Sequence, residues 1–428
     1  MKNRIAFISE HASPLATLGG VDSGGQNVYV AELAKYLAIT GYHIDIYTRW
    51  DDKELPQVVN WLPGIRVIHV KAGPVKFIAK EDLLQYMPEF TNSMLEFIAE
   101  EGLYYGLIHA NFFMSAMVAT DLKEILDIPF VVTFHALGHV RRIYQKEKDK
   151  FSAKRLLIEE EAVQKADQII AECPQDREDL INYYNASPEK ITVIPCGFNP
   201  SEFYPVNQVL ARVILNLDQD EKVILQLGRM VPRKGVDNVI KALGRLKAAG
   251  QQVRLVVVGG ETDTPDPVRC PEIGHLQRVA ESEGVLESII FVGRKNRDML
   301  KYYYSAADIF ITTPWYEPFG ITPLESMACG TPVIGSNVGG IKYSVLSGKT
   351  GYLVPPNNPE ALAQKIDILF SDPALHQTMK TNALHRVNNL FSWAHIAKMV
   401  DVMYGRILQP AQASIEIQPE LSKKSQAA

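Results

Sequence analysis

The sequence predicts an α/β protein with two doubly wound domains, each built on a mainly parallel sheet with helices on both faces. Short runs rich in β-branched residues alternate with longer segments of helical period, which is the pattern of βαβ units. The alternation restarts after a polar, proline-containing stretch at residues 195–205. The chain has 428 residues, more than the roughly 250 to 300 at which a single hydrophobic core stops growing. We therefore expect two domains with a cleft between them.

The expected elements divide between residues 1–196 and residues 197–391. The strands expected in the first domain are 4–8, 43–47, 66–70, 107–109, 130–133, 168–171 and 191–194, and the clearest helix is 27–40. The strands expected in the second domain are 223–227, 254–258, 289–292, 309–312 and 332–335. Residues 411–428 are polar and unpatterned, which predicts a disordered tail. Ligands of such folds bind where the carboxyl ends of the strands face the cleft.

Composition excludes several classes of protein. Hydrophobic residues make up 46% and charged residues 22% of the chain, which is typical of a globular protein with a large core. The net charge of -5 provides no general attraction for nucleic acid or for an anionic membrane. The four cysteines are scattered without CxxC spacing, which argues against a disulfide framework or a zinc site. The sequence shows neither a signal peptide nor an apolar run of membrane-spanning length, so we expect a cytoplasmic protein.

A glycine-rich segment, GGVDSGGQN at residues 19–27, precedes the clearest helix. Backbone N–H groups at the start of a helix, together with the helix dipole, favour an anion. Glycine also lets the backbone approach a ligand closely. The segment therefore predicts a phosphate site that includes Gly24 and Gly25. A flexible surface loop is the alternative, because a glycine-rich loop alone is weak support for a phosphate site.

A pair of cations follows the first strand of the second domain, in the segment QLGRMVPRKG at residues 226–235. Arg229 and Lys234 then lie between the end of a buried strand and the start of a helix, where both are expected to point into the cleft. The leaving group of a nucleotide diphosphate donor gains negative charge in the transition state, and fixed cations stabilise that charge without a metal ion. The alternative interpretation is a solvated basic turn.

The most informative segment is PWYEPFGITPLESMACGTPVIGS at residues 314–336, where Glu317 and Glu325 stand eight residues apart. Between them the chain turns and begins a helix, so the backbone N–H groups of residues 320–322 can hold a phosphate. Glu325, about one turn into the helix, can accept hydrogen bonds from a ribose, and Glu317 can reach sugar hydroxyls. Alternatively, both carboxylates merely complement the helix dipole.

These motifs together resemble the retaining GT-B glycosyltransferases of family 4 over nearly the whole chain. The GRxxPxKG and E-x7-E patterns carry the resemblance. The N-terminal stretch HASPLATLGGVDSGGQNVYV is similar to both the sucrose-phosphate synthases and the mycothiol-pathway inositol-phosphate glycosyltransferases, which share a phosphorylated acceptor. The resemblance implies the GT-B architecture, in which two Rossmann-like domains face a central cleft. It also implies that the last helix, at residues 392–409, crosses back to the first domain.

The resemblance also implies roles for individual residues. The catalytic candidates are His135, beside the reacting hydroxyls, Arg229 and Lys234, which clamp the diphosphate, and Glu317, which holds the donor sugar. The donor-binding candidates are Gly24, Gly25, Gln26, Arg294, Phe319, Gly320, Ile321, Thr322 and Glu325, with Arg294 near the base. The acceptor-binding candidates are Lys80, Arg155 and Gln26. The resemblance further implies front-face attack, in which the leaving phosphate oxygen takes the acceptor proton, so no side-chain base, metal ion or further cofactor is expected.

A basic stretch at residues 139–155, with seven Lys or Arg residues and two acidic ones, indicates the acceptor end. Such a cluster predicts a local anion site, consistent with Lys80 and Arg155 as ligands of an acceptor phosphate. A solvated, charged helix face is the alternative. The HANFF segment and Ala136 differ from both reference patterns, which leaves the acceptor open between the fructose 6-phosphate and inositol phosphate types. The GGVDSGGQ and WYEPFG segments favour the sucrose-phosphate type.

The sequence thus predicts transfer of a hexosyl group, with glucose from UDP-glucose as the best candidate, to a small phosphorylated sugar. The expected partners are this donor and acceptor, without nucleic acid and without a membrane, and the oligomeric state is left open. A first alternative is a peripheral membrane glycosyltransferase with a lipid acceptor, in which residues 139–155 face the membrane. A second alternative is a catalytically inactive protein that binds a nucleotide sugar. The base, the sugar and the acceptor depend on contacts that the sequence pattern does not resolve.

Overall fold

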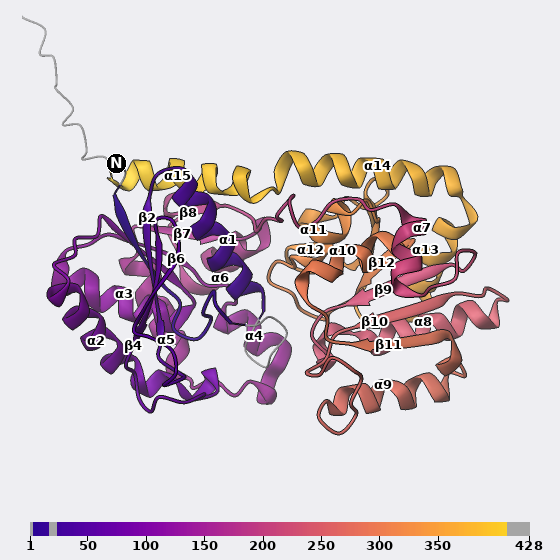
Figure 1. Ribbon diagram of the computed structural model, residues 1–428, viewed down its shortest axis with the longest axis horizontal. Helices are drawn as coiled ribbons and strands as arrows, with labels where there is room; N and C mark the ends of the chain where they lie inside the picture. The colour runs from indigo at the N-terminus through magenta and orange to yellow at the C-terminus, as the bar shows by residue number, and fades with distance from the viewer. Residues whose placement is uncertain (1–2, 17–23, 409–428) are drawn as a thin grey trace, which may run out of the picture.

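The computed structural model describes residues 3–16 and 24–408, which form two α/β bodies side by side (Figure 1). The first body contains an eight-stranded sheet in the order β3-β4-β2-β1-β5-β6-β7-β8. The second contains a six-stranded sheet in the order β11-β10-β9-β12-β13-β14. Neighbouring strands are parallel throughout, except for the antiparallel pair β3 and β4. The predicted fold class, with two doubly wound sheets, is confirmed.

The elements alternate along the chain as parallel pairing requires, since each parallel connection needs a crossover. The strands of the first sheet are β1 (Arg4–Ile8), β2 (His43–Arg49), β3 (Val58–Leu62), β4 (Ile65–Val70), β5 (Leu107–Asn111), β6 (Phe130–Thr133), β7 (Gln168–Ala171) and β8 (Ile191–Val193). The helices around it are α1 (Gly25–Ile39), α2 (Met87–Glu100), α3 (Phe113–Leu126), α4 (Gly138–Gln145), α5 (Lys154–Lys165) and α6 (Pro174–Tyr184).

The second sheet is built in the same way. Its strands are β9 (Val223–Leu227), β10 (Arg254–Val258), β11 (Ile289–Gly293), β12 (Ile309–Thr312), β13 (Val333–Ser336) and β14 (Gly351–Val354). The helices of this half are α7 (Gln208–Leu215), α8 (Val236–Ala248), α9 (Pro271–Ser282), α10 (Arg297–Ala306), α11 (Thr322–Ala328), α12 (Ile341–Ser344), α13 (Pro359–Ser371) and α14 (Pro373–Leu390), followed by α15 (Trp393–Leu408).

Burial of the central strands explains why their sequences are predominantly apolar. Strands β5, β9 and β12 are buried along their whole length, because helices cover both faces of each sheet. Each large aliphatic side chain that is fully buried in this way stabilises the fold by roughly 1.5 to 3 kcal/mol. The two sheets are therefore rigid, and the segments that follow their strands are held in fixed positions.

Every strand predicted from the sequence is present, with ends that differ by at most two residues. Two edge strands, β3 and β14, were not predicted. Strand β3 is half-exposed and returns to β4 through a tight turn at Gly64, so it has neither a buried apolar run nor a crossover helix. Strand β14 has four residues and begins at Gly351, a residue type that is depleted in strands.

The last two helices, α14 and α15, run along one side of both bodies (Figure 1). In α15, Trp393 is fully buried and meets Tyr29 of α1 edge to face, with ring centroids 5.7 Å apart. The hydroxyl of Tyr404, also in α15, lies 2.6 Å from Nδ1 of His109 in β5. The helix expected at residues 392–409 therefore does pack on the first sheet's helices and strands, and it ties the two halves of the chain together.

Two predicted segments lie outside the described residues, namely residues 19–23 of the glycine-rich segment and the tail at 411–428. Among residues 3–16 and 24–408, no helix has both the length and the apolar composition that crossing a membrane would require.

Candidate active site

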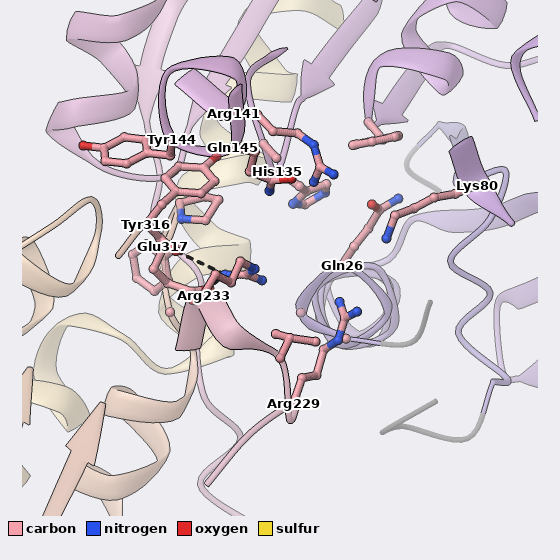
Figure 2. A pocket seen from close by; sticks show the side chains of 18 of the residues that line it. Gln26, Lys80, His135, Arg141, Tyr144, Gln145, Arg229, Arg233, Tyr316 and Glu317 are labelled. Carbon is pink, nitrogen blue, oxygen red and sulfur yellow. Dashed lines mark hydrogen bonds and ion pairs between the residues drawn. The ribbon is translucent and has the colours of Figure 1, made fainter. Parts of the chain in front are cut away.

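Two adjoining cavities lie between the two sheets' domains. The larger, of about 470 Å³, is lined by residues of both halves of the chain (Figure 2). The smaller, of about 350 Å³, is lined mainly by the second half and by the start of α1. The residues that line both cavities are Gly24, Gly25, Arg229, Glu317, Gly320 and Ile321. Because these residues are shared, the two cavities form one site with two ends.

Almost all of the site residues predicted from the sequence line this site. Besides the shared residues, those in the larger cavity are Gln26, Lys80, His135 and Phe319. Those in the smaller cavity are Lys234, Arg294, Thr322 and Glu325. Arg155 lines neither cavity. The larger cavity thus contains the predicted acceptor side, and the smaller one contains the predicted nucleotide side.

Glu317 is the carboxylate at the junction of the two cavities, and it is held by two cations. Its Oε2 lies 2.5 Å from Nζ of Lys234 and 3.2 Å from Nη1 of Arg233. Burial alone would raise the pKa of Glu317, but the two cations outweigh it and lower the pKa to about 2. Burial lowers the pKa of Lys234, and Glu317 opposes that effect. The side chain of Glu317 is therefore an ionised hydrogen-bond acceptor at neutral pH.

A tight turn between β9 and α8 brings Lys234 to this carboxylate. Gly235 caps α8 with φ +65°, and any side chain there would collide with the carbonyl oxygen of Thr313 at the end of β12. The hydroxyl of Thr313 donates to the carbonyl oxygen of Gly235 at 3.0 Å, which fixes the close approach. The glycine of the PRKG motif is thus required so that the turn packs against the strand that leads to Glu317. Arg233 belongs to the same motif but was not predicted, because it stands at a variable position of the GRxxPxKG pattern.

Glu325 of α11 is buried and has a partner for each of its oxygens. Oε1 lies 3.0 Å from Nη1 of Arg297, and Oε2 accepts a hydrogen bond of 3.0 Å from the hydroxyl of Tyr304. Arg297 also lines the smaller cavity and pairs with Glu202, so it bridges two carboxylates. Sequence reasoning missed Arg297. Arg297 is the first residue of α10 and follows β11, and this position at the start of a helix could have identified it as a site residue.

The start of α1 forms the edge that both cavities share. The side chain of Asn27 accepts a hydrogen bond of 2.8 Å from the backbone N–H of Gly24 and so holds the first turn. The amide of Gln26 donates to the carbonyl oxygen of Asn111 and to the hydroxyl of Ser9, both at 3.2 Å. Gln26 is thereby fixed at the carboxyl ends of β1 and β5. Figure 2 shows it on the side of the larger cavity that also carries Lys80.

His135 follows β6 in an unusual backbone conformation, with φ +58°. Its Nδ1 lies 3.1 Å from Oε1 of Glu172, and its Nε2 lies 3.0 Å from Oδ1 of Asn111. Tyr29 packs against the ring edge to face, with centroids 4.8 Å apart. The imidazole is thus held on three sides at the wall of the larger cavity. Glu172 also lines that wall, and it was not predicted because it follows β7 without any recognisable motif.

Three cations from the first half of the chain line the larger cavity. Lys80 comes from a short 3-10 turn at Lys80–Asp82, whereas Arg141 and Lys148 come from the basic stretch at residues 139–155. Arg141 is held in place by Asp149, whose Oδ1 lies 2.7 Å from its Nε. The basic stretch therefore does supply cations to the cavity, although Arg141 and Lys148 were not singled out in advance.

Arg155, the other predicted acceptor residue, is buried with only 2% of its surface exposed. Its Nε donates to Glu159 at 2.7 Å, and its Nη2 donates to the carbonyl oxygen of Ala136. The rings of Phe112 and Phe151, which line the larger cavity, cover the guanidinium at 5.0 and 4.8 Å. Arg155 therefore lies behind the cavity wall rather than in the cavity. It contacts Ala136, the residue that follows His135.

The described residues hold no group of three or more His, Cys, Asp or Glu side chains placed to bind a metal ion. Arg229, Arg233 and Lys234 supply positive charge at the junction of the cavities. Figure 2 shows Arg229 below the start of α1 and Arg233 beside Glu317.

Two family models match the chain, one in each half. A family model described as "Glycosyl transferases group 1" matches residues 208–386, and one described as "Glycosyltransferase Family 4" matches residues 23–202. D-inositol 3-phosphate glycosyltransferase 2 of Catenulispora acidiphila is 32% identical over 416 residues, which cover 96% of this chain and 97% of that protein.

Solved structures are similar over the same extent. Sucrose-phosphate synthase from Thermosynechococcus elongatus superposes with a TM-score of 0.87 and 35% identity, covering 95% of this chain and 99% of that one. Anabaena HepE, solved in complex with UDP-glucose, has a TM-score of 0.73 and 21% identity, covering 95% of this chain and 100% of that one. At 21% identity, the similarity to HepE shows the shared fold alone.

Proposed function

Because the chain belongs to glycosyltransferase family 4 and has the GT-B fold, we propose that it transfers glucose from UDP-glucose, with retention, to a small phosphorylated sugar. The observation that carries the proposal is the continuous site between the two halves. Donor-type groups, namely Arg229, Lys234 and Glu317, meet Lys80 and other acceptor-type cations there within two connected cavities.

The donor fits the junction of the cavities. The nucleotide occupies the smaller cavity, with the ribose at Glu325 and the base towards Arg294. The diphosphate lies between Arg229, Lys234 and the backbone N–H groups at the start of α11, which include those of Ile321 and Thr322. Both cations face the oxygen that gains charge as the glycosidic bond breaks, and this is where fixed charge lowers a barrier most.

The transferred sugar lies in the larger cavity, beside the pair of Glu317 and Lys234. An ionised Glu317 accepts hydrogen bonds from sugar hydroxyls, while Phe319 and Gly320 close the surface beneath the ring. The bond from the anomeric carbon to the diphosphate oxygen breaks, and a bond to the acceptor oxygen forms on the same face. The acceptor proton passes to the leaving phosphate oxygen, so no side-chain base is assigned. His135 orients the reacting hydroxyls from the opposite wall.

A phosphate on the acceptor is supported by the three cations Lys80, Arg141 and Lys148 on the far side of the larger cavity. The two similar proteins, a D-inositol 3-phosphate glycosyltransferase and a sucrose-phosphate synthase, are both named for phosphorylated compounds. Gln26, which is fixed between β1 and β5, lies between these cations and the donor. Arg155 acts through Ala136 by holding the turn that carries His135.

The test is a matrix of UDP-, ADP- and GDP-sugars against fructose 6-phosphate, inositol phosphate, the free sugars and a glycolipid acceptor. Nucleotide release and product mass identify the pair that reacts, and proton NMR of the product reports the anomeric configuration. The expected result is fastest transfer from UDP-glucose to a phosphorylated sugar, with retention. Transfer to free sugars or lipid at equal or higher rates, or inversion of the anomeric centre, would contradict the proposal.

A further inference from the structure

Two tyrosines from the two halves of the chain stack on each other at the mouth of the larger cavity. Tyr144 belongs to α4, and Tyr316 belongs to the segment between β12 and α11. Their ring centroids are 5.3 Å apart and their planes differ by 14°. Both residues line the larger cavity, and neither lines the smaller one. Figure 2 shows the two rings one above the other, on the side of the cavity opposite Lys80 and Gln26.

Tyr316 is firmly anchored. Although it belongs to the second half of the chain, it packs against the hydrophobic core of the first domain. Its carbonyl oxygen accepts a hydrogen bond of 3.1 Å from Nη1 of Arg233, the group that also binds Glu317. The ring therefore has a fixed position beside the donor-binding carboxylate, and it provides a rigid base for the ring of Tyr144.

Tyr144 is the solvent-exposed member of the stacked pair. Its surface is 48% exposed, so one side of the stack faces solvent while the other side faces the cavity. Arg141 and Gln145, which precede and follow it on α4, also line the cavity. The Tyr144 side chain therefore contacts both the cavity and solvent at this point.

We propose that the stack of Tyr144 on Tyr316 limits the length of the acceptor to one sugar unit, which makes Tyr144 a specificity-determining residue. This inference rests on the proposed function, because it assigns the larger cavity to the acceptor. The location supports it, since Arg141, on the same helix as Tyr144, lines the larger cavity, whereas Arg294, assigned to the base, lines only the smaller one. An acceptor that carries a second sugar unit would need the space that the Tyr144 ring fills.

The test compares kcat/KM for the preferred phosphorylated hexose with kcat/KM for the same phosphate carrying one further sugar unit. Tyr144→Ala is expected to shift the ratio by about tenfold or more towards the longer acceptor, because a filled volume is removed. Tyr144→Phe keeps the ring and should keep the ratio. Tyr183→Ala is the matched control, since Tyr183 is 42% exposed and stacks on His139 at 5.9 Å, yet it does not line either cavity.

A ratio for Tyr144→Ala within about threefold of wild type would overturn the inference. An equal loss of kcat for both acceptors would also overturn it, because the stack would then join the domains without selecting the acceptor. Circular dichroism and thermal unfolding confirm that each variant is folded. If the wild type uses no phosphorylated hexose, the proposed function fails separately. The same ratio is then measured with the short and extended forms of the acceptor that does react, so the size limit is still decided.

Discussion

Replacing Glu317 with Gln should remove most of the turnover, because the change breaks a buried ion pair where we propose that the donor sugar binds. The two cations lower the pKa of Glu317 from 4.5 to about 2, even though burial acts in the opposite direction. At about 1.36 kcal/mol per pH unit, that difference is roughly 3 kcal/mol in favour of the carboxylate. Glutamine keeps the shape and one acceptor oxygen, but it leaves Lys234 and Arg233 without their counter-charge.

Two measurements separate the effects of Glu317→Gln on catalysis and on folding. The initial rate of UDP release at saturating substrates should fall by about 10² to 10³, the range seen when one group that stabilises a transition state is removed. The free energy of unfolding, measured in urea, should fall by up to roughly 3 kcal/mol, which is the free energy estimated above from the pKa shift of Glu317. Because the pKa of Glu317 is depressed in the folded protein, this stability is present above pH 4.5 and is lost as the pH falls through about 2.

A double-mutant cycle shows whether the pair is the cause. Lys234→Met and Glu317→Gln should together destabilise the protein by at least about 1 kcal/mol less than the sum of the single changes. Glu221→Gln is the control, because it breaks an ion pair with Arg254 of 2.6 Å on the surface and should leave turnover unchanged. Additive effects on stability, or near-normal turnover of Glu317→Gln, would refute the assignment of the pair to the donor sugar.

Three further predictions test other parts of the molecule. Lys80→Ala should raise the acceptor KM by about tenfold or more and leave the donor KM unchanged, whereas the exposed control Lys53→Ala should change neither; an unchanged acceptor KM would count against a phosphate contact. Arg155→Met should lower the unfolding free energy by about 3 to 5 kcal/mol, measured in urea, because the buried Glu159 carboxylate would lose its cationic partner; a loss below about 1 kcal/mol would contradict the role of Arg155 in holding this turn. Burial lowers the pKa of His109 to about 3, so its contribution to folding stability should be complete above pH 6.5 and should fall as the pH drops towards 3. The measurement is the thermal unfolding temperature at a series of pH values. If His109→Gln shows the same dependence of unfolding temperature on pH as the wild type, the prediction is wrong.

The fold was predictable because its signals are local. Parallel strands buried on both faces, such as β9 and β12, are predominantly apolar runs, and a helix follows each of them along the chain. The edge strand β3 was not predicted because it is half-exposed and pairs with β4, its neighbour in the chain. It therefore lacks both the apolar run and the following helix. Register and edge position are decided by tertiary pairing, which a single sequence does not encode locally.

The candidate site was predictable where function requires a motif with fixed spacing. Gly235 shows why, since the close approach to Thr313 permits only glycine there, and the motif therefore identifies the position of Lys234 as well. Residues that act from isolated positions gave no such signal. Glu172, which holds His135, follows β7 with no pattern around it, and only the three-dimensional pairing of β6 with β7 places it there.

Arg155 shows the opposite case, a charged residue of a basic stretch that does not line the cavity. Charge composition predicts that a cluster binds an anion, but the direction of each side chain depends on its helix. On α5, Arg155 points inward and is neutralised by Glu159 one turn later, whereas Arg141 on α4 reaches the cavity. The phase of a helix relative to the core is set by packing, so two arginines of the same stretch can have different surroundings.

The segment between β12 and α11 links the two ends of the site. Tyr316 and Glu317 are adjacent, and Arg233 binds the backbone of the first and the carboxylate of the second. A movement of this segment must therefore shift the carboxylate proposed to bind the donor together with the wall proposed to limit the acceptor. It follows that Tyr316→Ala should alter the KM of both donor and acceptor, whereas Tyr144→Ala, on the outer side of the same stack, should alter only the acceptor. An equal effect of the two variants on the donor KM would show that the wall and the carboxylate are not coupled through this segment.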